Sequence, residues 1–114
     1  MLIQYKIDLG TIYIKGGIIE GKNNEAISNA NSNAATVIIG TEDGIINTNS
    51  PIIIGKKAAL NTKGVEFYDG IIKGVKVLND SMILKREANS VITHGADETI
   101  NGTVYKTTFL SYET

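Results

Sequence analysis

The sequence contains no cysteine, no tryptophan, one proline and one histidine in 114 residues. Without cysteine, the chain has no disulfide framework, no thiolate zinc site and no cysteine nucleophile. The formal net charge is −1, and basic and acidic residues are interspersed without a basic cluster, which argues against nucleic-acid binding. The longest apolar runs, such as 52–54, are far too short to span a membrane.

Isoleucine, glycine and asparagine are abundant instead. β-Branched residues fit the pleated, half-buried surface of a sheet. Glycine and asparagine tolerate the positive φ that tight turns need. The length fits one domain over 1–114. We therefore expect a single all-β domain.

A Gly-Ile-Ile block occurs three times, beginning at Gly17, Gly44 and Gly70, with spacings of 27 and 26 residues. Self-similarity at a fixed period of this size is typical of stacked repeats, in which each unit buries its apolar face against a neighbour. Asp43 and Asp69 precede two of these glycines. An Asx side chain that bonds local backbone, followed by a glycine with positive φ, makes a turn. We therefore assign structural turns to Gly17, Gly44 and Gly70.

Aligning the chain on those three glycines predicts which positions face the core. Two mostly apolar columns result, Ile14, Thr41 and Phe67 three residues before the glycine and Ile12, Ile39 and Val65 five before it. Residues two apart share one face of a strand, so we predict that both columns are buried. The two isoleucines of each block must then point to opposite faces. The sequence leaves open whether one of them turns a corner or the outer face is covered.

The repeat favours a short right-handed parallel β-helix of about three rungs over residues 10–80, because a near-constant period is expected of stacked coils and not of hairpins. Asp-Gly between strands is also a hairpin signal, so a β-sandwich of hairpins is the alternative.

Further strands are expected to complete this arrangement. A third strand closing each coil is predicted within 25–29, 58–61 and 75–79. After about residue 90 the repeat stops, and two alternating segments, Ser90–Thr93 and Thr103–Leu110, predict a C-terminal strand or hairpin cap over 90–114.

The string from Ala59 to Gly74 resembles the parallel β-helix rungs of large surface proteins from low-GC Gram-positive bacteria. Its Asn-Thr-Lys-Gly turn, alternating strand, Asp-Gly and Ile-Ile carry the resemblance, and 105–110 is similar to the strand that follows the last rung there. The resemblance implies a structural or adhesin-like segment without catalysis, located extracellularly or at the cell surface, as a fragment without its signal peptide. It implies a cell-surface glycan or a host or partner protein as ligand. Separately, the uncovered ends of a short coil predict end-to-end self-association through open rungs. Other parallel β-helices cleave polysaccharides, so a carbohydrate-binding or carbohydrate-active β-helix is the alternative.

The candidate ligand face consists of outward-facing polar and aromatic residues, namely Tyr13, Lys15, Glu42, Asp43, Tyr68 and Asp69. The alignment predicts two surface columns, Lys15–Glu42–Tyr68 and Glu20–Asn47–Lys73. Tyrosine rings on such a face are suited to stacking on sugar rings.

Asp43 and Asp69 would lie about 4.8 Å apart if they stacked, close enough to share a cation or raise a pKa. The simpler interpretation is that each bonds its own turn. His94 lies beside a turn glycine, with no serine in a nucleophile-elbow setting. We predict no catalytic residue, no metal and no cofactor.

Overall fold

The computed structural model describes residues 5–7, 10–29, 35–61, 64–76 and 80–113. In these residues the chain is all-β, with one short 3-10 turn and no α-helix. The expectation of an all-β chain is therefore confirmed.

The strands form three sheets. The first sheet contains β1 (Tyr5–Ile7), β4 (Ile27–Asn29) and β7 (Leu60–Asn61). The second contains, in spatial order, β10 (Ile83–Arg86), β8 (Gly64–Phe67), β5 (Ala35–Ile39) and β2 (Gly10–Ile14). The third contains β11 (Ser90–His94), β13 (Thr103–Tyr112), β9 (Ile71–Lys76), β6 (Ile52–Ala58) and β3 (Ile18–Gly21), with β12 (Glu98–Ile100) paired to β13. The 3-10 turn, Asp80–Met82, precedes β10.

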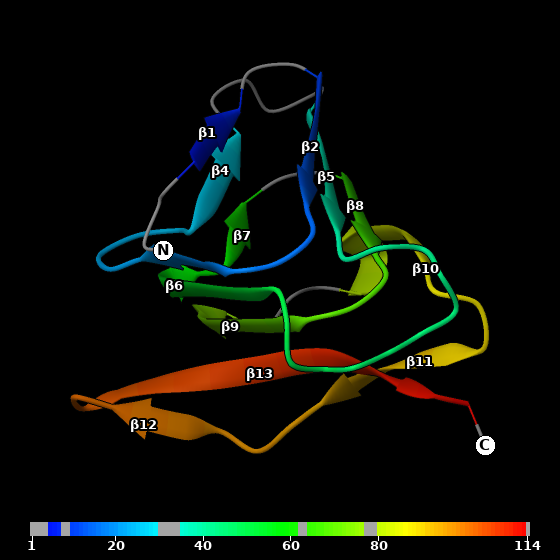
Figure 1. Ribbon diagram of the computed structural model, residues 1–114. Coiled ribbons are helices and arrows are strands. Elements are labelled where there is room, and N and C mark those ends of the chain that lie inside the picture. The colour runs from blue at the N-terminus through cyan, green and yellow to red at the C-terminus, as the bar shows by residue number, and fades with distance from the viewer. Residues whose placement is uncertain (1–4, 8–9, 30–34, 62–63, 77–79, 114) are drawn as a thin grey trace.

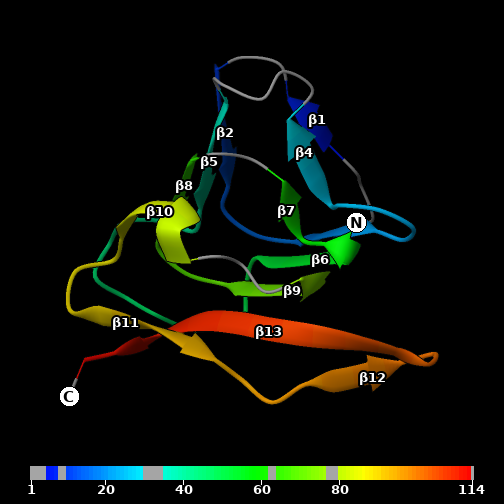
Figure 2. The same ribbon diagram turned by 180° about the vertical axis from the view of Figure 1, so that it is seen from behind.

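The chain visits the three sheets in the same order three times. Strands β1, β2 and β3 lie in the first, second and third sheets, and β4–β6 and then β7–β9 repeat that order. All pairs among these nine strands are parallel. Figures 1 and 2 show the three sheets arranged as the sides of a triangle around a shared interior. Each strand therefore finds its partner one full circuit away in the sequence.

The interior is filled by aliphatic side chains from all three sheets. Its buried members are Ile14, Ile19, Ala26, Ile27, Val37, Ile39, Ile53, Ala59, Leu60, Val65, Phe67, Ile72 and Leu110. Burying one side chain of Val, Ile or Phe size stabilises a fold by about 1.5–3 kcal/mol. The inward columns of the parallel sheets are thus the main source of stability.

The glycine-based alignment is wrong in the middle pass. In the second sheet, Ile39 lies between Ile14 and Phe67. Thr41, which was expected in that column, lies beyond the strand and is exposed. Val37 takes the position expected for Ile39. The physical reason is a long irregular segment, residues 40–51, which lengthens the path from β5 to β6 and shifts the register by two residues.

The three turn glycines do adopt positive φ, with values of 82° at Gly17, 78° at Gly44 and 108° at Gly70. Their assignment as turn residues is confirmed. However, Gly44 lies within segment 40–51 and not at the start of a strand, and Ile45 after it is 54% exposed. The middle Gly-Ile-Ile block is therefore not equivalent to the other two.

The isoleucine pairs that stack in the third sheet are Ile18-Ile19, Ile52-Ile53 and Ile71-Ile72. The second member of each pair is buried, at 7%, 0% and 3% exposure, and the first faces outward. The orientation that the sequence left open is therefore that the second isoleucine points into the core and the first points outward. These pairs begin 34 and then 19 residues apart, so the constant period does not reflect the true repeat.

A column of glycines completes the repeat. Gly21, Gly55 and Gly74 stack in the third sheet, each two residues after the buried isoleucine. A Cβ on Gly55 would collide with the carbonyl oxygen of Ala58, and one on Gly74 would lie 2.7 Å from the nitrogen of Ala59. The backbone approaches too closely here for any side chain, so the structural repeat is Ile-Ile-x-Gly.

The remaining strand predictions are largely confirmed. Strands β4 and β7 lie within two of the three expected closing segments. In the third, Val75 and Lys76 belong to the end of β9, and residues 77–79 lie outside the described residues. β11 and β13 are the two predicted C-terminal strands. β13 runs antiparallel to β9 and thus occupies the edge of the last parallel strand.

Candidate functional site

The outward side of the second sheet carries a row of mixed side chains. Alternation places Tyr13, Ile38, Glu66 and Lys85 opposite the buried columns, and the register aligns them across β2, β5, β8 and β10. Tyr13, at the edge of the row, is 64% exposed. The row therefore presents an aromatic ring, an aliphatic side chain, a carboxylate and an ammonium group on one face.

A tyrosine–glutamate pair lies at the β8 end of this face. The Tyr68 hydroxyl donates a hydrogen bond of 2.7 Å to Glu66 Oε1, although the Tyr68 side chain is almost fully buried. Burial raises the pKa of Tyr68 well above its usual value of 10, and the hydrogen bond to Glu66 adds to the effect. The charges of Glu66, Glu42 and Glu87 raise this pKa further. Tyr68 therefore stays protonated as a hydrogen-bond donor.

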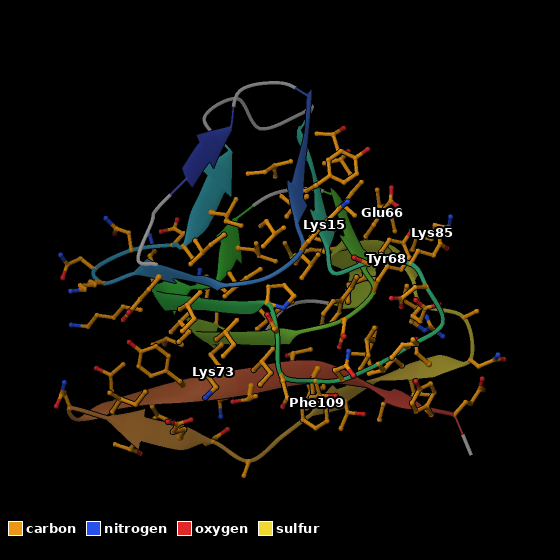
Figure 3. All side chains as sticks on the ribbon, viewed as in Figure 1. Lys15, Glu66, Tyr68, Lys73, Lys85 and Phe109 are labelled. Carbon is orange, nitrogen blue, oxygen red and sulfur yellow. The ribbon has the colours of Figure 1, made fainter. Side chains whose placement is uncertain are left out.

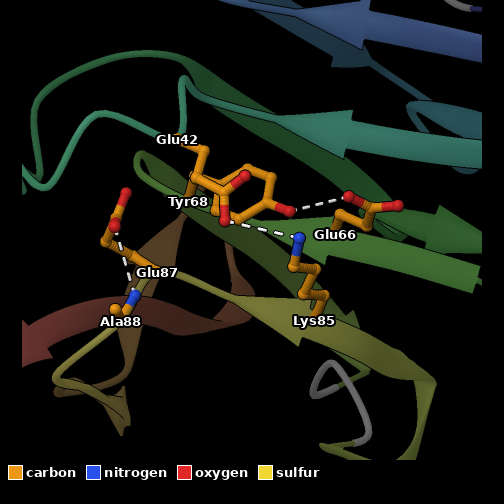
Figure 4. Close-up of polar contacts among 6 residues, drawn as sticks. All are labelled: Glu42, Glu66, Tyr68, Lys85, Glu87 and Ala88. Carbon is orange, nitrogen blue, oxygen red and sulfur yellow. Dashed lines mark hydrogen bonds and ion pairs between the residues drawn. The ribbon is translucent and has the colours of Figure 1, made fainter.

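An ion pair flanks this tyrosine. Glu42, from segment 40–51, and Lys85, from β10, approach to 3.4 Å. Figure 4 shows this pair beside the Tyr68–Glu66 hydrogen bond, and Figure 3 places Glu66, Tyr68 and Lys85 together at the same end of the second sheet. Both partners are more than half exposed, so the pair adds less than about 1 kcal/mol to stability.

Glu87 brings a buried carboxylate to the same region. Its side chain is 3% exposed, and Oε1 accepts a hydrogen bond of 3.1 Å from the Ala88 N–H. Oε2 has no hydrogen-bond partner among the described residues. A buried carboxylate oxygen without a donor destabilises the fold. With Glu42 and Glu66, it gives this end of the sheet an excess of negative charge.

Two of the predicted ligand-face residues are not on the surface. Tyr68 and Asp69 are 3% and 6% exposed, so their expected outward position is wrong. Tyr13, Lys15, Glu42 and Asp43 are exposed as expected. Of these four, Glu42 lies beside Tyr68, and the role of all six residues as ligand residues stays a prediction.

The column Lys15–Glu42–Tyr68 is also wrong. The Gly40 N–H donates to Ile14 O, and the Tyr68 N–H donates to Ile39 O, so Gly40 occupies the middle of that column. In the second predicted column, Ile54 replaces Asn47 between Glu20 and Lys73. The first error is the two-residue shift described above, whereas the second is a shift of seven residues, because segment 40–51 delays the start of β6 to Ile52.

Asp69 anchors segment 40–51. Its carboxylate accepts hydrogen bonds from the backbone N–H groups of Asn47, Thr48 and Gly70, at 3.1, 2.9 and 2.8 Å. Asp43, in contrast, accepts one local bond of 3.0 Å from Ile45 N. The two aspartates therefore act in different turns and do not stack.

A second contact holds the same segment against the C-terminal strand. The Tyr112 hydroxyl accepts a hydrogen bond of 2.8 Å from Ile46 N and donates one of 3.3 Å to Gly44 O. Thr48 Oγ1 donates to Leu110 O at 3.4 Å. Segment 40–51 is thus fixed to both the parallel and the antiparallel part of the molecule.

Sequence reasoning missed the roles of Glu66, Lys85 and Glu87. Alternation along β8 places Glu66 outward, and that signal was available. Lys85 and Glu87 reach the site because β10 joins the second sheet beside β8. No local pattern encodes that pairing.

Within the described residues, no group of three or more histidine, aspartate or glutamate side chains has the arrangement of a metal site. Comparison of the chain with protein-family models, curated proteins and solved structures gave no match. In the part of the chain that the structure describes, no helix is long and apolar enough to cross a membrane.

Proposed function

We propose that the chain is a short right-handed parallel β-helix that serves as a structural or adhesive segment at a bacterial surface or outside the cell, without catalysis. The observation that carries this proposal is the winding of the nine parallel strands through three sheets in a fixed order. Crossovers between parallel strands are right-handed in nearly all proteins, which supports the handedness. A β-sandwich of hairpins would instead pair strands that are adjacent in the sequence.

Engineered disulfides test the architecture, because the chain has no cysteine of its own. Thr11 and Thr36 are paired on neighbouring parallel strands. The double variant Thr11→Cys/Thr36→Cys should oxidise to an intramolecular disulfide, whereas Thr11→Cys combined with Ile38→Cys should not. If only the second combination cross-linked, the parallel register would be wrong and a sandwich favoured.

Surface display tests the function. The chain, expressed on the surface of a non-adherent bacterium, should increase retention on host-cell or matrix-coated surfaces relative to the same anchor carrying no insert. Incubation with polysaccharides should release no reducing ends. Depolymerisation would contradict the proposal, and retention equal to that of the empty anchor would exclude its adhesive form.

Binding of a cell-surface glycan is the second candidate function, and the exposure of Tyr13 favours it. The ring is 64% exposed and shares a row with Glu66 two strands away, about 10 Å apart by strand spacing. An aromatic platform beside a carboxylate suits one sugar ring. On a glycan array, Tyr13→Ala should abolish any hit that Tyr13→Phe retains, and an array without hits would remove this candidate.

End-to-end association remains part of the proposal. Strands β1, β2 and β3 each lie at the end of their sheet, while on the opposite side of the third sheet β13 covers the edge of β9 and β11 pairs with β13. Unpaired strand edges favour pairing with another chain. Association of this kind would therefore use the edges of β1–β3.

A further inference from the structure

The outward side of the third sheet is apolar across four strands. One row contains the first isoleucine of each stacked pair and a phenylalanine, namely Ile18, Ile52, Ile71 and Phe109. Ile18 is 38% exposed, and the other three are partly exposed. Neighbouring strands lie about 4.8 Å apart, so the row extends about 14 Å across the sheet. The solvent-facing side of a sheet usually carries polar residues, so this apolar row is atypical of an outer surface.

The next outward row carries opposite charges at matching positions. The register aligns Glu20 on β3, Ile54 on β6 and Lys73 on β9. Glu20 has no ion-pair partner among the described residues, whereas Lys73 Nζ lies 2.7 Å from Glu98 Oε2. A lysine ammonium group has three donors and accommodates a second carboxylate. Figure 3 shows Lys73 and Phe109 on the same side of the third sheet.

These two rows are self-complementary. A two-fold axis parallel to β6 would place each copy's β3 over the other copy's β9, with β6 over β6. Glu20 would then face Lys73 of a second copy, Ile18 would face Ile71, and Ile52 would face Ile52. A surface patch that matches itself in this way is what a two-fold interface requires.

We propose that the outward face of β3, β6 and β9 is a dimerisation surface for a second copy of this chain. Two sheets would pack face to face about 10 Å apart, as in β-sandwiches. The apolar row extends only about 14 Å across the sheet, so the patch is smaller than the roughly 800 Å² that each partner contributes to a stable interface. The dimer is therefore weak and forms at high protein concentration. This inference rests on the strand register and is independent of the proposed surface function.

Sedimentation velocity over a wide range of protein concentrations tests the proposal. The chain should shift from monomer to dimer as concentration rises. Ile52→Asp, which places two like charges on the axis, should weaken dimerisation by about tenfold or more. Leu84→Asp is the control, because Leu84 is 66% exposed on the second sheet. A monomer at every concentration, or equal weakening by Leu84→Asp, would overturn the proposal.

Single cysteines test the geometry without charging the interface. Facing Cα atoms on sheets about 10 Å apart are too distant for a direct disulfide, so the cysteines are joined with a short bismaleimide cross-linker. Ile52→Cys chains should be linked into dimers faster than Thr11→Cys chains, because Thr11 lies outside the proposed surface at the edge of the second sheet. A mixture of Glu20→Cys and Lys73→Cys chains should cross-link to each other faster than either chain does to itself. Faster cross-linking by Thr11→Cys would indicate edge-to-edge association and overturn the proposal, as would equal rates in the mixture. Circular dichroism confirms that each variant is folded.

Discussion

The register of the parallel strands β1–β9 and that of the antiparallel strands β11–β13 are determined in different ways. In the parallel part, the strand that pairs with a given strand lies one full circuit away in the sequence. The stacked isoleucines are followed by a column of stacked glycines, where the backbone packs closely. In the antiparallel part, Ile100 pairs with Thr103 across the two-residue turn Asn101-Gly102, where φ is 51° and 80°. The parallel part therefore tolerates a long insertion such as 40–51 but no side chain at its glycine column. The antiparallel part depends on one local turn.

A substitution in the glycine column should have the largest effect. Gly55→Ala is expected to lower the free energy of unfolding by about 3 kcal/mol or more, because its Cβ must overlap the Ala58 carbonyl. Gly102→Ala should cost only about 1–2 kcal/mol, because its Cβ meets nothing within 4 Å and only the φ of 80° opposes it. Urea unfolding measures both. Equal losses would mean that close packing does not distinguish the two parts.

The two phenylalanines give the next comparison. Phe67 is fully buried on β8, and Phe109 lies partly exposed on β13. Phe67→Ala is expected to cost about 3–5 kcal/mol through lost burial and a cavity. Phe109→Ala should cost about 1–2 kcal/mol at concentrations where the chain is monomeric. Thermal unfolding of the two variants measures both losses of stability. A larger loss for Phe109→Ala than for Phe67→Ala would contradict an outward position of Phe109 on β13.

Segment 40–51 connects the two parts, and its aspartates should differ. Asp69→Ala is expected to cost about 2–3 kcal/mol, because it leaves the N–H groups of Asn47 and Thr48 without their acceptor. Asp43→Ala removes one exposed local bond and should cost about 0.5 kcal/mol. Amide hydrogen exchange at Asn47 and Thr48 should accelerate in the first variant only. Unchanged exchange in Asp69→Ala would exclude its role as anchor.

Alkaline pH should destabilise the chain through Tyr68. Its pKa is raised in the folded state, so the contribution is fully present below the unfolded pKa of about 10 and is lost as pH rises above it. The free energy of unfolding of Tyr68→Phe should therefore fall less steeply above pH 10 than that of the unsubstituted chain. Parallel curves for the two proteins would show that Tyr68 ionises as readily folded as unfolded.

The smallest effect is expected at the surface of the antiparallel part. Lys106 Nζ lies 2.7 Å from Asp97 Oδ2, and both side chains are at least 40% exposed. Lys106→Ala should cost about 0.2–1 kcal/mol, and high salt should remove most of the difference. A salt-independent loss would indicate that the lysine stem packs against Gly74 and does not act through its charge.

Among the antiparallel strands, β11 and β13 were predicted from sequence because their alternation is local, whereas β12 was not predicted although its turn signal is also local. Asn101-Gly102 between alternating segments specifies a two-residue hairpin turn. In the parallel part, several strands were predicted, but β6 was expected directly after Gly44 and the pairing of the strands was not predicted. A recurring Gly-Ile-Ile block suggested a register that the extra length of 40–51 breaks, and only the three-dimensional ladder reveals that Ile52-Ile53 is the true equivalent of Ile18-Ile19.

The candidate site shows the same limit. The exposure of Tyr13 and the turn role of Asp43 follow from alternation and turn chemistry. The burial of Asp69 depends on a segment that folds back from 21 residues earlier in the sequence. Glu87 enters the site through the pairing of β10 with β8, two strands that are separated in the sequence by β9 and a 3-10 turn. Neither arrangement produces a periodic pattern in the sequence.

The position of β13 also has a consequence for synthesis on the ribosome. Because β13 follows all the parallel strands in the chain, the edge of β9 has no partner until residue 112 has left the exit tunnel. During that interval the nascent chain presents an open strand edge beside partly buried isoleucines, a state that favours misassociation between neighbouring nascent chains. β13 is thus the strand that covers the open edge of β9, and translation pauses before it would be harmful.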